Sequence, residues 1–143
     1  MKINLQVITP EKVVLSEDVD QVSIPTTRGE ITVLPHHVNL VTPVAEGELI
    51  IKNNSRTEYF AVAGGFLEIA HNIATVLADY AVHSDEINME KALEAQKRAE
   101  EMLKKAKENA SDRDLALAET QMRRAILQLK VSGRRKERRN ITS

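Results

Sequence analysis

The sequence predicts an α+β fold, in which an N-terminal antiparallel β-sandwich of eight to ten short strands is followed by a C-terminal antiparallel α-helical hairpin. All four prolines and four of the five glycines lie before residue 66. Apolar residues alternate with polar ones in the first part of the chain, as in half-buried strands, and recur every three or four residues in the second part, as on a helix face. Residues 1–83 carry 5 Lys/Arg and 10 Asp/Glu, whereas residues 84–143 carry 15 and 11.

The first domain, residues 1–83, is predicted to consist of short strands separated by turns. Apolar and polar side chains alternate from the first residues, and Thr9-Pro10 ends this run. Asn53-Asn54 and His71-Asn72 have turn-forming composition and are expected to connect hairpins. Many short strands without helical periodicity indicate a sandwich or a barrel. Further apolar runs occur at 13–15, 19–24, 31–33, 49–51, 59–63, 66–69 and 73–78.

Two consecutive glycines, Gly64 and Gly65, stand between two of these apolar runs. Glycine inside a strand pattern indicates a β-bulge or a place where two backbones come close together. We therefore expect the chain to bend or to contact a neighbouring strand closely at this point.

The second domain, residues 84–143, is predicted to be two helices of about 20 residues each, packed antiparallel across a turn at residues 109–112. Asn88 is a good N-cap, because its side-chain oxygen can accept a hydrogen bond from an unpaired N–H group of the first turn. Faces rich in alanine bury little area, so the hairpin should be marginally stable on its own. The apolar stripes are Ala92, Ala95, Ala99, Leu103, Ala106 and Ala110, then Leu115, Ala118, Met122, Ala125, Ile126 and Leu129.

The residues show no pattern typical of a catalytic or metal site. The chain has no Cys, which excludes disulfides and thiolate ligands. It also has no Gly-rich phosphate loop. His36 and His37 are adjacent, and neighbouring side chains on an extended chain point in opposite directions, so they make a poor pair of metal ligands. No apolar run approaches the roughly 18 residues of a membrane span, and the N-terminus does not resemble a signal peptide. These observations indicate a non-enzymatic interaction protein.

The C-terminal end is strongly basic. Such a segment is either solvated or a contact for an acidic protein surface or nucleic acid. Aromatic residues make up only 3% of the chain, which leaves no platform for stacking bases, and we therefore expect no nucleic acid partner. An adaptor that uses this tail for nucleic acid or anionic surfaces is the alternative function. Its basic residues are Lys130, Arg134, Arg135, Lys136, Arg138 and Arg139, with Glu137 among them.

One stretch resembles a known family. Residues 29–43 read Gly-Glu-Ile-Thr-Val-Leu-Pro-His-His-Val-Asn-Leu-Val-Thr-Pro. This is similar to the Gly-Glu-x-Gly-x-Leu-Pro-Gly-His-x-x-Leu-Val-Thr pattern of the epsilon subunit of F-type ATP synthases. Residues 6–10, 60–69 with 75–78, and 124–131 resemble the opening strand, the final strands and the end of the second helix of that family. The resemblance therefore covers almost the entire chain in order.

The resemblance implies that residues 1–83 bind the gamma subunit of the central stalk and contact the membrane rotor ring of c subunits. Glu30 and His37 occupy the positions that face the ring in the family. Such a subunit is not a catalyst. It couples gamma to the ring during proton transport and ATP synthesis, as a peripheral protein on the cytoplasmic face of the bacterial plasma membrane.

The resemblance also implies that residues 84–143 are regulatory. In the family, the hairpin either folds against the sandwich or extends along gamma toward the alpha and beta subunits, where it inhibits ATP hydrolysis. Basic residues of the second helix then meet acidic loops of the beta subunits. The residues that match here are Arg123, Arg124 and Lys130, with Arg134 and Arg135 beyond them.

Several positions depart from the family pattern. Thr32 and His36 replace two glycines, which is expected to stiffen the loop that faces the ring. Some bacterial relatives bind ATP through Ile-Asp-x-x-Arg-Ala at the start of the first helix and through arginines late in the second.

The corresponding residues here are Ile87, Asn88, Lys91 and Ala92, together with Arg124, while Gln128 replaces a further arginine. Lys lacks the planar fork of Arg. We therefore expect no obligate cofactor, and a regulatory ATP site that is weakened or lost.

Overall fold

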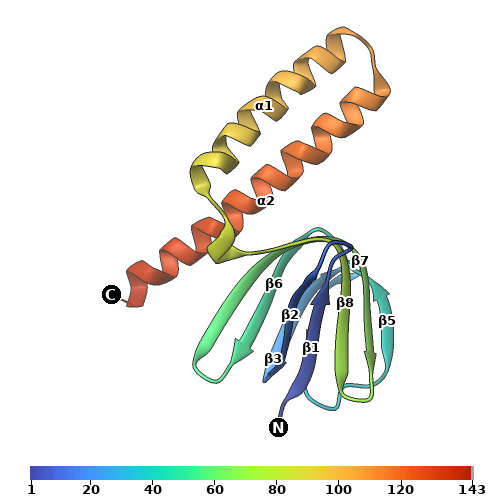
Figure 1. Ribbon diagram of the computed structural model, residues 1–143, viewed down its shortest axis with the longest axis vertical. Coiled ribbons are helices and arrows are strands. Elements are labelled where there is room, and N and C mark those ends of the chain that lie inside the picture. Colours follow the sequence, from blue (N-terminus) through green and yellow to red (C-terminus); the bar gives the residue numbers. More distant parts are fainter. Residues whose placement is uncertain (143) are drawn as a thin grey trace. The chain divides into compact units, whose positions relative to one another are not determined.

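The computed structural model describes the backbone of residues 1–142 and the side chains of residues 1–133. The chain divides into two compact units, Met1–Ser84 and Asp85–Ser143. Figure 1 shows strands in the first unit and two long helices in the second. The predicted α+β fold class is confirmed.

The first unit contains eight strands, the lower end of the predicted range. Their order in the sheet is β2-β1-β8-β7-β6-β3-β4, and β5 pairs with β7. A short 3-10 turn, η1 (Ser84–Glu86), follows the last strand. The strands are β1 (Ile3–Ile8), β2 (Val13–Val19), β3 (Gln21–Thr26), β4 (Gly29–Val33), β5 (Leu40–Pro43), β6 (Gly47–Asn53), β7 (Arg56–Ala70) and β8 (Ile73–His83).

The strand pairs are antiparallel, as predicted, with one exception among the described strands. β1 and β8 run parallel, with Asn4 opposite Ile73 and Ile8 opposite Leu77. Sequence patterning did not reveal this pair, because no short hairpin connects the first strand to the last and the alternation of side chains is the same for either direction. A smaller difference concerns Val19, which ends β2 rather than opening the following strand.

β7 is one bent strand of 15 residues, not two separate strands as the apolar runs suggested. β8 pairs with β7 along the whole length of β8. β6 pairs with the first half of β7, and β5 pairs with the second half of β7. Gly64 and Gly65, at the bend, have φ angles of 70° and 99°. A Cβ atom on Gly65 would lie 1.8 Å from the carbonyl oxygen of Leu77. The expected close backbone approach at the two glycines is therefore confirmed.

The core of the first unit is aliphatic, with Phe60 as its largest fully buried side chain. β1 illustrates the pattern, because Ile3, Leu5 and Val7 are fully buried while the residues between them are partly exposed. Removing this apolar area from water stabilises the sheet by about 25 cal/mol per Å². The other large buried residues include Val19, Val22, Ile24, Val33, Leu49, Ile51, Leu67 and Ile69.

The second unit is a hairpin of α1 (Met89–Glu108) and α2 (Asp112–Thr142), which lie side by side in Figure 1. The predicted N-cap is confirmed, because the Asn88 side chain accepts a hydrogen bond from the backbone N–H of Lys91 at 3.2 Å. The Ser111 hydroxyl likewise accepts from the backbone N–H of Asp114. At 31 residues, α2 is longer than the predicted length of about 20, since its basic end continues the helix.

Alanines are prominent among the buried residues of the two helices. Three alanines of α1 are buried at intervals of seven residues, and two of α2 are buried at the same interval. Residues seven apart lie on the same face of a helix after two turns. Each alanine offers only one methyl group, so these residues bury little apolar area, and α2 also buries Leu127 and Val131. These alanines are Ala92, Ala99, Ala106, Ala118 and Ala125.

Candidate functional site

An exposed row of apolar side chains crosses five neighbouring strands of the first unit. Pro43 of β5 is paired with Phe66 of β7, and Phe66 with Leu77 of β8. Leu77 is in turn paired with Ile8 of β1, and Ile8 with Val13 of β2. Directly paired residues present their side chains on the same face of a sheet. We call these five residues the apolar row.

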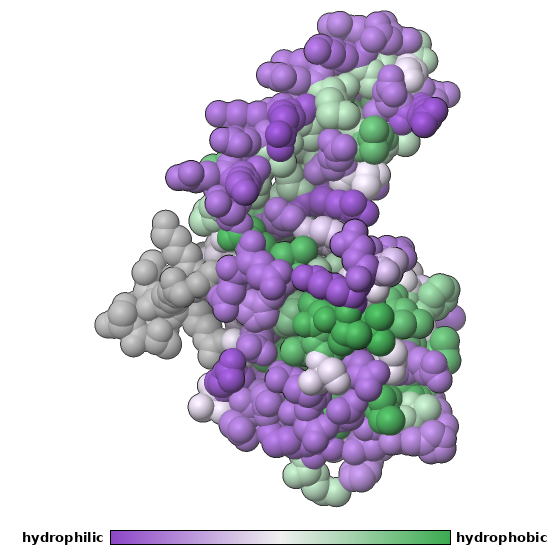
Figure 2. All heavy atoms as spheres, in the orientation of Figure 1, coloured by the Kyte–Doolittle hydropathy of each residue, from purple (hydrophilic) through white to green (hydrophobic). Residues whose placement is uncertain are grey.

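The side chains of the apolar row reach the surface. Phe66 is 56% exposed, Leu77 is 51% exposed and Val13 is 61% exposed. Figure 2 shows hydrophobic residues gathered on the sandwich, in the area of β1 and β8. A continuous exposed apolar patch of this kind marks an interaction surface more often than scattered single residues do.

Sequence reasoning missed the apolar row, although a signal was present. Phe66 is followed by the buried Leu67, and Leu77 follows the buried Val76. Adjacent residues on a strand point to opposite faces, so one apolar residue of each pair had to point outward. The alignment of these outward residues into one row, however, depends on strand pairings that are distant in sequence.

The structure places Glu30 and His37, the two predicted ring-facing residues, on different segments. Glu30 is an exposed residue of β4, paired with Pro25. His37 lies in the loop of residues 34–39 between β4 and β5, and its Nδ1–H donates to the carbonyl oxygen of Val38 at 2.7 Å. Val38 is 76% exposed. The loop thus has both polar and apolar groups at its surface.

The predicted inhibitory residues lie on α2. Arg123, Arg124 and Lys130 are exposed. The Arg123 guanidinium donates to the hydroxyl of Thr120 at 3.3 Å. Consecutive helix residues are about 100° apart around the axis, so Arg123 and Arg124 point in different directions. The side chains of Arg134 and Arg135 lie outside the described residues.

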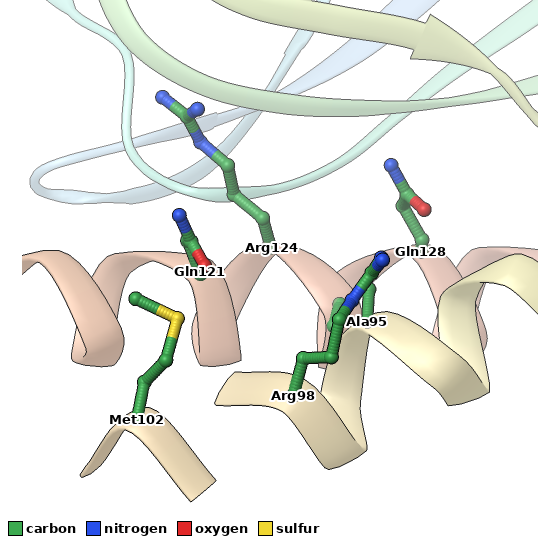
Figure 3. Close-up of a pocket in the computed structure, with 7 residues that line it drawn as sticks. Ala95, Arg98, Met102, Gln121, Arg124 and Gln128 are labelled. Carbon is green, nitrogen blue, oxygen red and sulfur yellow. The ribbon is translucent and has the colours of Figure 1, made fainter. Parts of the chain in front are cut away.

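A groove of about 400 Å³ lies between α1 and α2, and Figure 3 shows Arg98 rising from α1 and Arg124 from α2 along it. Two guanidinium groups and two side-chain amides give this groove donors suited to an anion. Its lining residues are Ala95, Arg98, Met102, Gln121, Arg124, Ala125 and Gln128.

Of the residues proposed for ATP, Arg124 lines this groove. Ile87, Asn88, Lys91 and Ala92 do not belong to its lining. The carbonyl oxygen of the Asn88 side chain accepts the N-cap hydrogen bond, and Ala92 is buried. Sequence reasoning missed Arg98 as a lining residue. Its position three residues after Ala95, a member of the predicted apolar stripe, places both on one helix face, which is the signal that could have identified it.

No helix among the described residues is long and apolar enough to cross a membrane.

Comparison with known proteins covers both units. Residues 2–84 match the family model described as "ATP synthase, Delta/Epsilon chain, beta-sandwich domain", and residues 85–133 match the "long alpha-helix domain" of the same chain. The ATP synthase epsilon chain of Herpetosiphon aurantiacus is 41% identical over 138 residues, which cover 96% of this chain and 99% of the relative. That of Chloroflexus aggregans is 42% identical over 133 residues, which cover 92% and 93%.

Solved structures share the fold. A chain of the Euglena gracilis mitochondrial ATP synthase, solved by cryo-EM as OSCP/F1/c-ring in rotational state 1, superposes with a TM-score of 0.71. The match covers 85% of this chain and 76% of that chain at 22% identity. The likeness to that chain supports the architecture, and the family matches along the chain support its membership. This protein belongs to the ATP synthase epsilon chain family.

Proposed function

We propose that the protein is a non-catalytic subunit of the central stalk of an F-type ATP synthase. It would couple gamma to the c ring and restrain ATP hydrolysis through α1 and α2. The apolar row is the observation that carries this proposal, because a rotor-coupling sandwich needs a surface that stays attached to its partner during rotation. In a bacterium, the subunit would lie on the cytoplasmic face of the plasma membrane as a peripheral component.

The apolar row is the proposed contact with gamma. Its members project from five strands held together by backbone hydrogen bonds, so the surface is rigid before binding. A rigid apolar surface loses little conformational freedom on association, which favours a stable contact. The core of a protein interface is typically apolar, whereas charged residues lie at its rim.

Leu77→Asp tests this contact, with Ile73→Asp as the matched control. Both residues are exposed on the same face of β8, but Ile73 is paired with Asn4 and lies outside the apolar row. Burying a Leu side chain contributes about 1.5–3 kcal/mol. Leu77→Asp should therefore weaken gamma binding at least about tenfold. Titration with purified gamma measures the effect, and equal weakening by both variants would place the contact elsewhere.

Glu30 and His37 are the proposed contacts with the c ring. Both are polar and accessible, and His37 lies in a loop that also exposes Leu34 and Val38. Such a mixed surface suits a contact that forms against the polar loops of a ring. Loss of coupling between hydrolysis and proton pumping in a Glu30→Ala/His37→Ala enzyme would support this assignment, and unchanged coupling would refute it.

The inhibitory role is assigned to α2. Arg123, Arg124 and Lys130, together with Arg134 and Arg135, would meet acidic loops of the beta subunits when the hairpin extends toward the alpha and beta subunits. The alanine contact between the helices supports a movable hairpin, because small side chains bury little area and are replaced by other contacts at low cost.

The groove between the helices is the proposed remnant of a regulatory ATP site. Arg124, aided by Arg98, offers positive charge to phosphate oxygens. The segment from Ile87 to Ala92, which leads into α1, carries Asn88 and Lys91 in place of the acidic residue and the arginine of the ATP-binding relatives. Binding should therefore be weak. Calorimetric titration of the 143-residue chain with ATP measures it, and tight binding would contradict the proposal.

A further inference from the structure

Asn72 connects three segments of the first unit that are far apart in sequence. Its side-chain oxygen accepts a hydrogen bond from the backbone N–H of His36 at 2.8 Å. Its side-chain NH₂ donates to the carbonyl oxygen of Lys2 at 2.9 Å. Its own carbonyl oxygen accepts from the backbone N–H of Asn4 at 3.2 Å. One residue of the β7–β8 turn thus joins the loop of residues 34–39 to the start of β1.

The loop residue held by Asn72 has a conformation that is unfavourable for a side chain. His36 has a φ of 62°, in the left-handed region. A residue with a Cβ atom is disfavoured there by about 1–2 kcal/mol. Such a conformation persists only when the surroundings hold it in place. The hydrogen bond from the His36 N–H to Asn72 is a direct restraint of this kind.

The conformation of His36 sets the direction of the residues that follow. The next residue, His37, donates its backbone N–H to the carbonyl oxygen of Leu34 at 3.2 Å, which closes the loop into a turn. If His36 returned to a negative φ, the chain direction at His37 would change and this turn would open. The position of His37 and Val38 therefore depends on the angle that Asn72 restrains.

We propose that Asn72 is a positioning residue that holds the 34–39 loop in the conformation presented to the c ring. The partner of the loop rests on the proposed function, whereas the restraint itself rests on the contacts above. An asparagine fits this position for two reasons. Its amide supplies the acceptor for His36 and the donor for Lys2 together. It also tolerates the left-handed φ of 61° that the turn requires.

Asn72→Gly tests the restraint in the full 143-residue chain. Glycine keeps the turn geometry and the carbonyl that accepts from Asn4, but it removes both side-chain hydrogen bonds. The matched control is His71→Gly, at the neighbouring turn residue with a φ of 52°. Amide exchange at the His37 N–H, followed by NMR, reports the opening of the loop.

Asn72→Gly should accelerate this exchange about fivefold, which corresponds to the loss of one neutral hydrogen bond. His71→Gly should change it by less than about twofold. Asn72→Asp retains an acceptor for His36 and should remain closer to the wild type than Asn72→Gly. Equal exchange in the wild type and Asn72→Gly would overturn the proposal.

The assembled ATP synthase provides the functional readout. Asn72→Gly should lower the proton pumping obtained per ATP hydrolysed, in the same direction as Glu30→Ala/His37→Ala. The positioning role would be wrong if Asn72→Gly opens the loop but does not change coupling, while Glu30→Ala/His37→Ala does reduce coupling. If Glu30→Ala/His37→Ala leaves coupling intact, the ring contact itself is refuted, and exchange at His37 still decides whether Asn72 restrains the loop.

Discussion

At the scale of single residues, Asp20 links the stability of the first unit to pH. Its carboxylate lies at the corner between β2 and β3 and accepts hydrogen bonds from the backbone N–H of Asn54 at 2.6 Å and from the Lys2 ammonium at 3.1 Å. The Lys2 ammonium also contacts the side-chain oxygens of Asn53 and Asn54. The hydrogen bond from Asn54, followed by that from Lys2, lowers the pKa of Asp20 below its usual 3.8.

The lowered pKa of Asp20 determines whether the stability of the fold rises or falls with pH. A carboxylate whose pKa is lower in the folded state stabilises the fold above its unfolded pKa, and that contribution is lost as the pH falls through the folded value. Asp20→Asn should therefore lower Tm at neutral pH and have a smaller effect below the usual carboxyl range. The exposed Glu11→Gln serves as control, and an equal Tm difference for Asp20→Asn at both pH values would contradict the argument.

Rules that use only neighbouring residues predicted the structural role of some residues but not of others. Asn88 was predictable as an N-cap, because a cap depends on atoms within one helical turn. Leu77 was not recognisable as part of the apolar row, since its neighbours Phe66 and Ile8 come from other strands. Arg98 was overlooked because the groove depends on how α2 aligns with α1. Sequence periodicity gives the face of an element but not its partner.

At the scale of secondary-structure elements, the bend in β7 brings Gly65 against the backbone of Leu77 in β8. Gly65→Ala places a Cβ against the carbonyl oxygen of Leu77 and strains a φ of 99°. Gly29→Ala strains a similar φ of 110°, but nothing lies within 4 Å of the added Cβ. The two variants therefore separate a backbone clash from strain alone.

Gly65→Ala should lower the free energy of unfolding by about 3 kcal/mol or more, and Gly29→Ala by about 1–2 kcal/mol. Urea denaturation of each variant measures these values. If both variants lose the same free energy, the close approach to Leu77 contributes nothing, and the bend tolerates a side chain.

The strands also show which features can be predicted from the sequence pattern and which cannot. Gly64 and Gly65 predicted an irregularity in the strand pattern. They did not predict that β7 continues past this point and pairs first with β6 and then with β5 along the same edge. The parallel pairing of β1 with β8 could not be predicted from the sequence, because the side chains of a strand alternate between the two faces in the same way for either strand direction. The predicted roles of Glu30 and His37 came from the family resemblance and not from any local physical rule.

At the scale of the whole molecule, the division into two units lets the proposed binding and inhibitory roles be tested separately by truncation. A chain cut after Asn88 keeps all eight strands and loses both helices. An ATP synthase with this shortened subunit should assemble normally and hydrolyse ATP faster than the intact enzyme, because the proposed contact of α2 with the beta subunits is lost. Hydrolysis rates and subunit composition of the purified enzyme measure this. Unchanged hydrolysis would remove the inhibitory role from the helices.

The parallel pair of β1 and β8 also determines when the first unit can be completed during synthesis. The ribosome makes β1 first, yet the edge of β1 next to β8 has no partner until residues 73–77 have been made. Pairing between segments so distant in sequence is slow, because a long loop must close before any contact forms. β8 ends at His83, and the first unit ends one residue later, at Ser84. All eight strands have therefore been synthesised before the first residue of α1 is translated, and the pairings between them lie within residues 3–83.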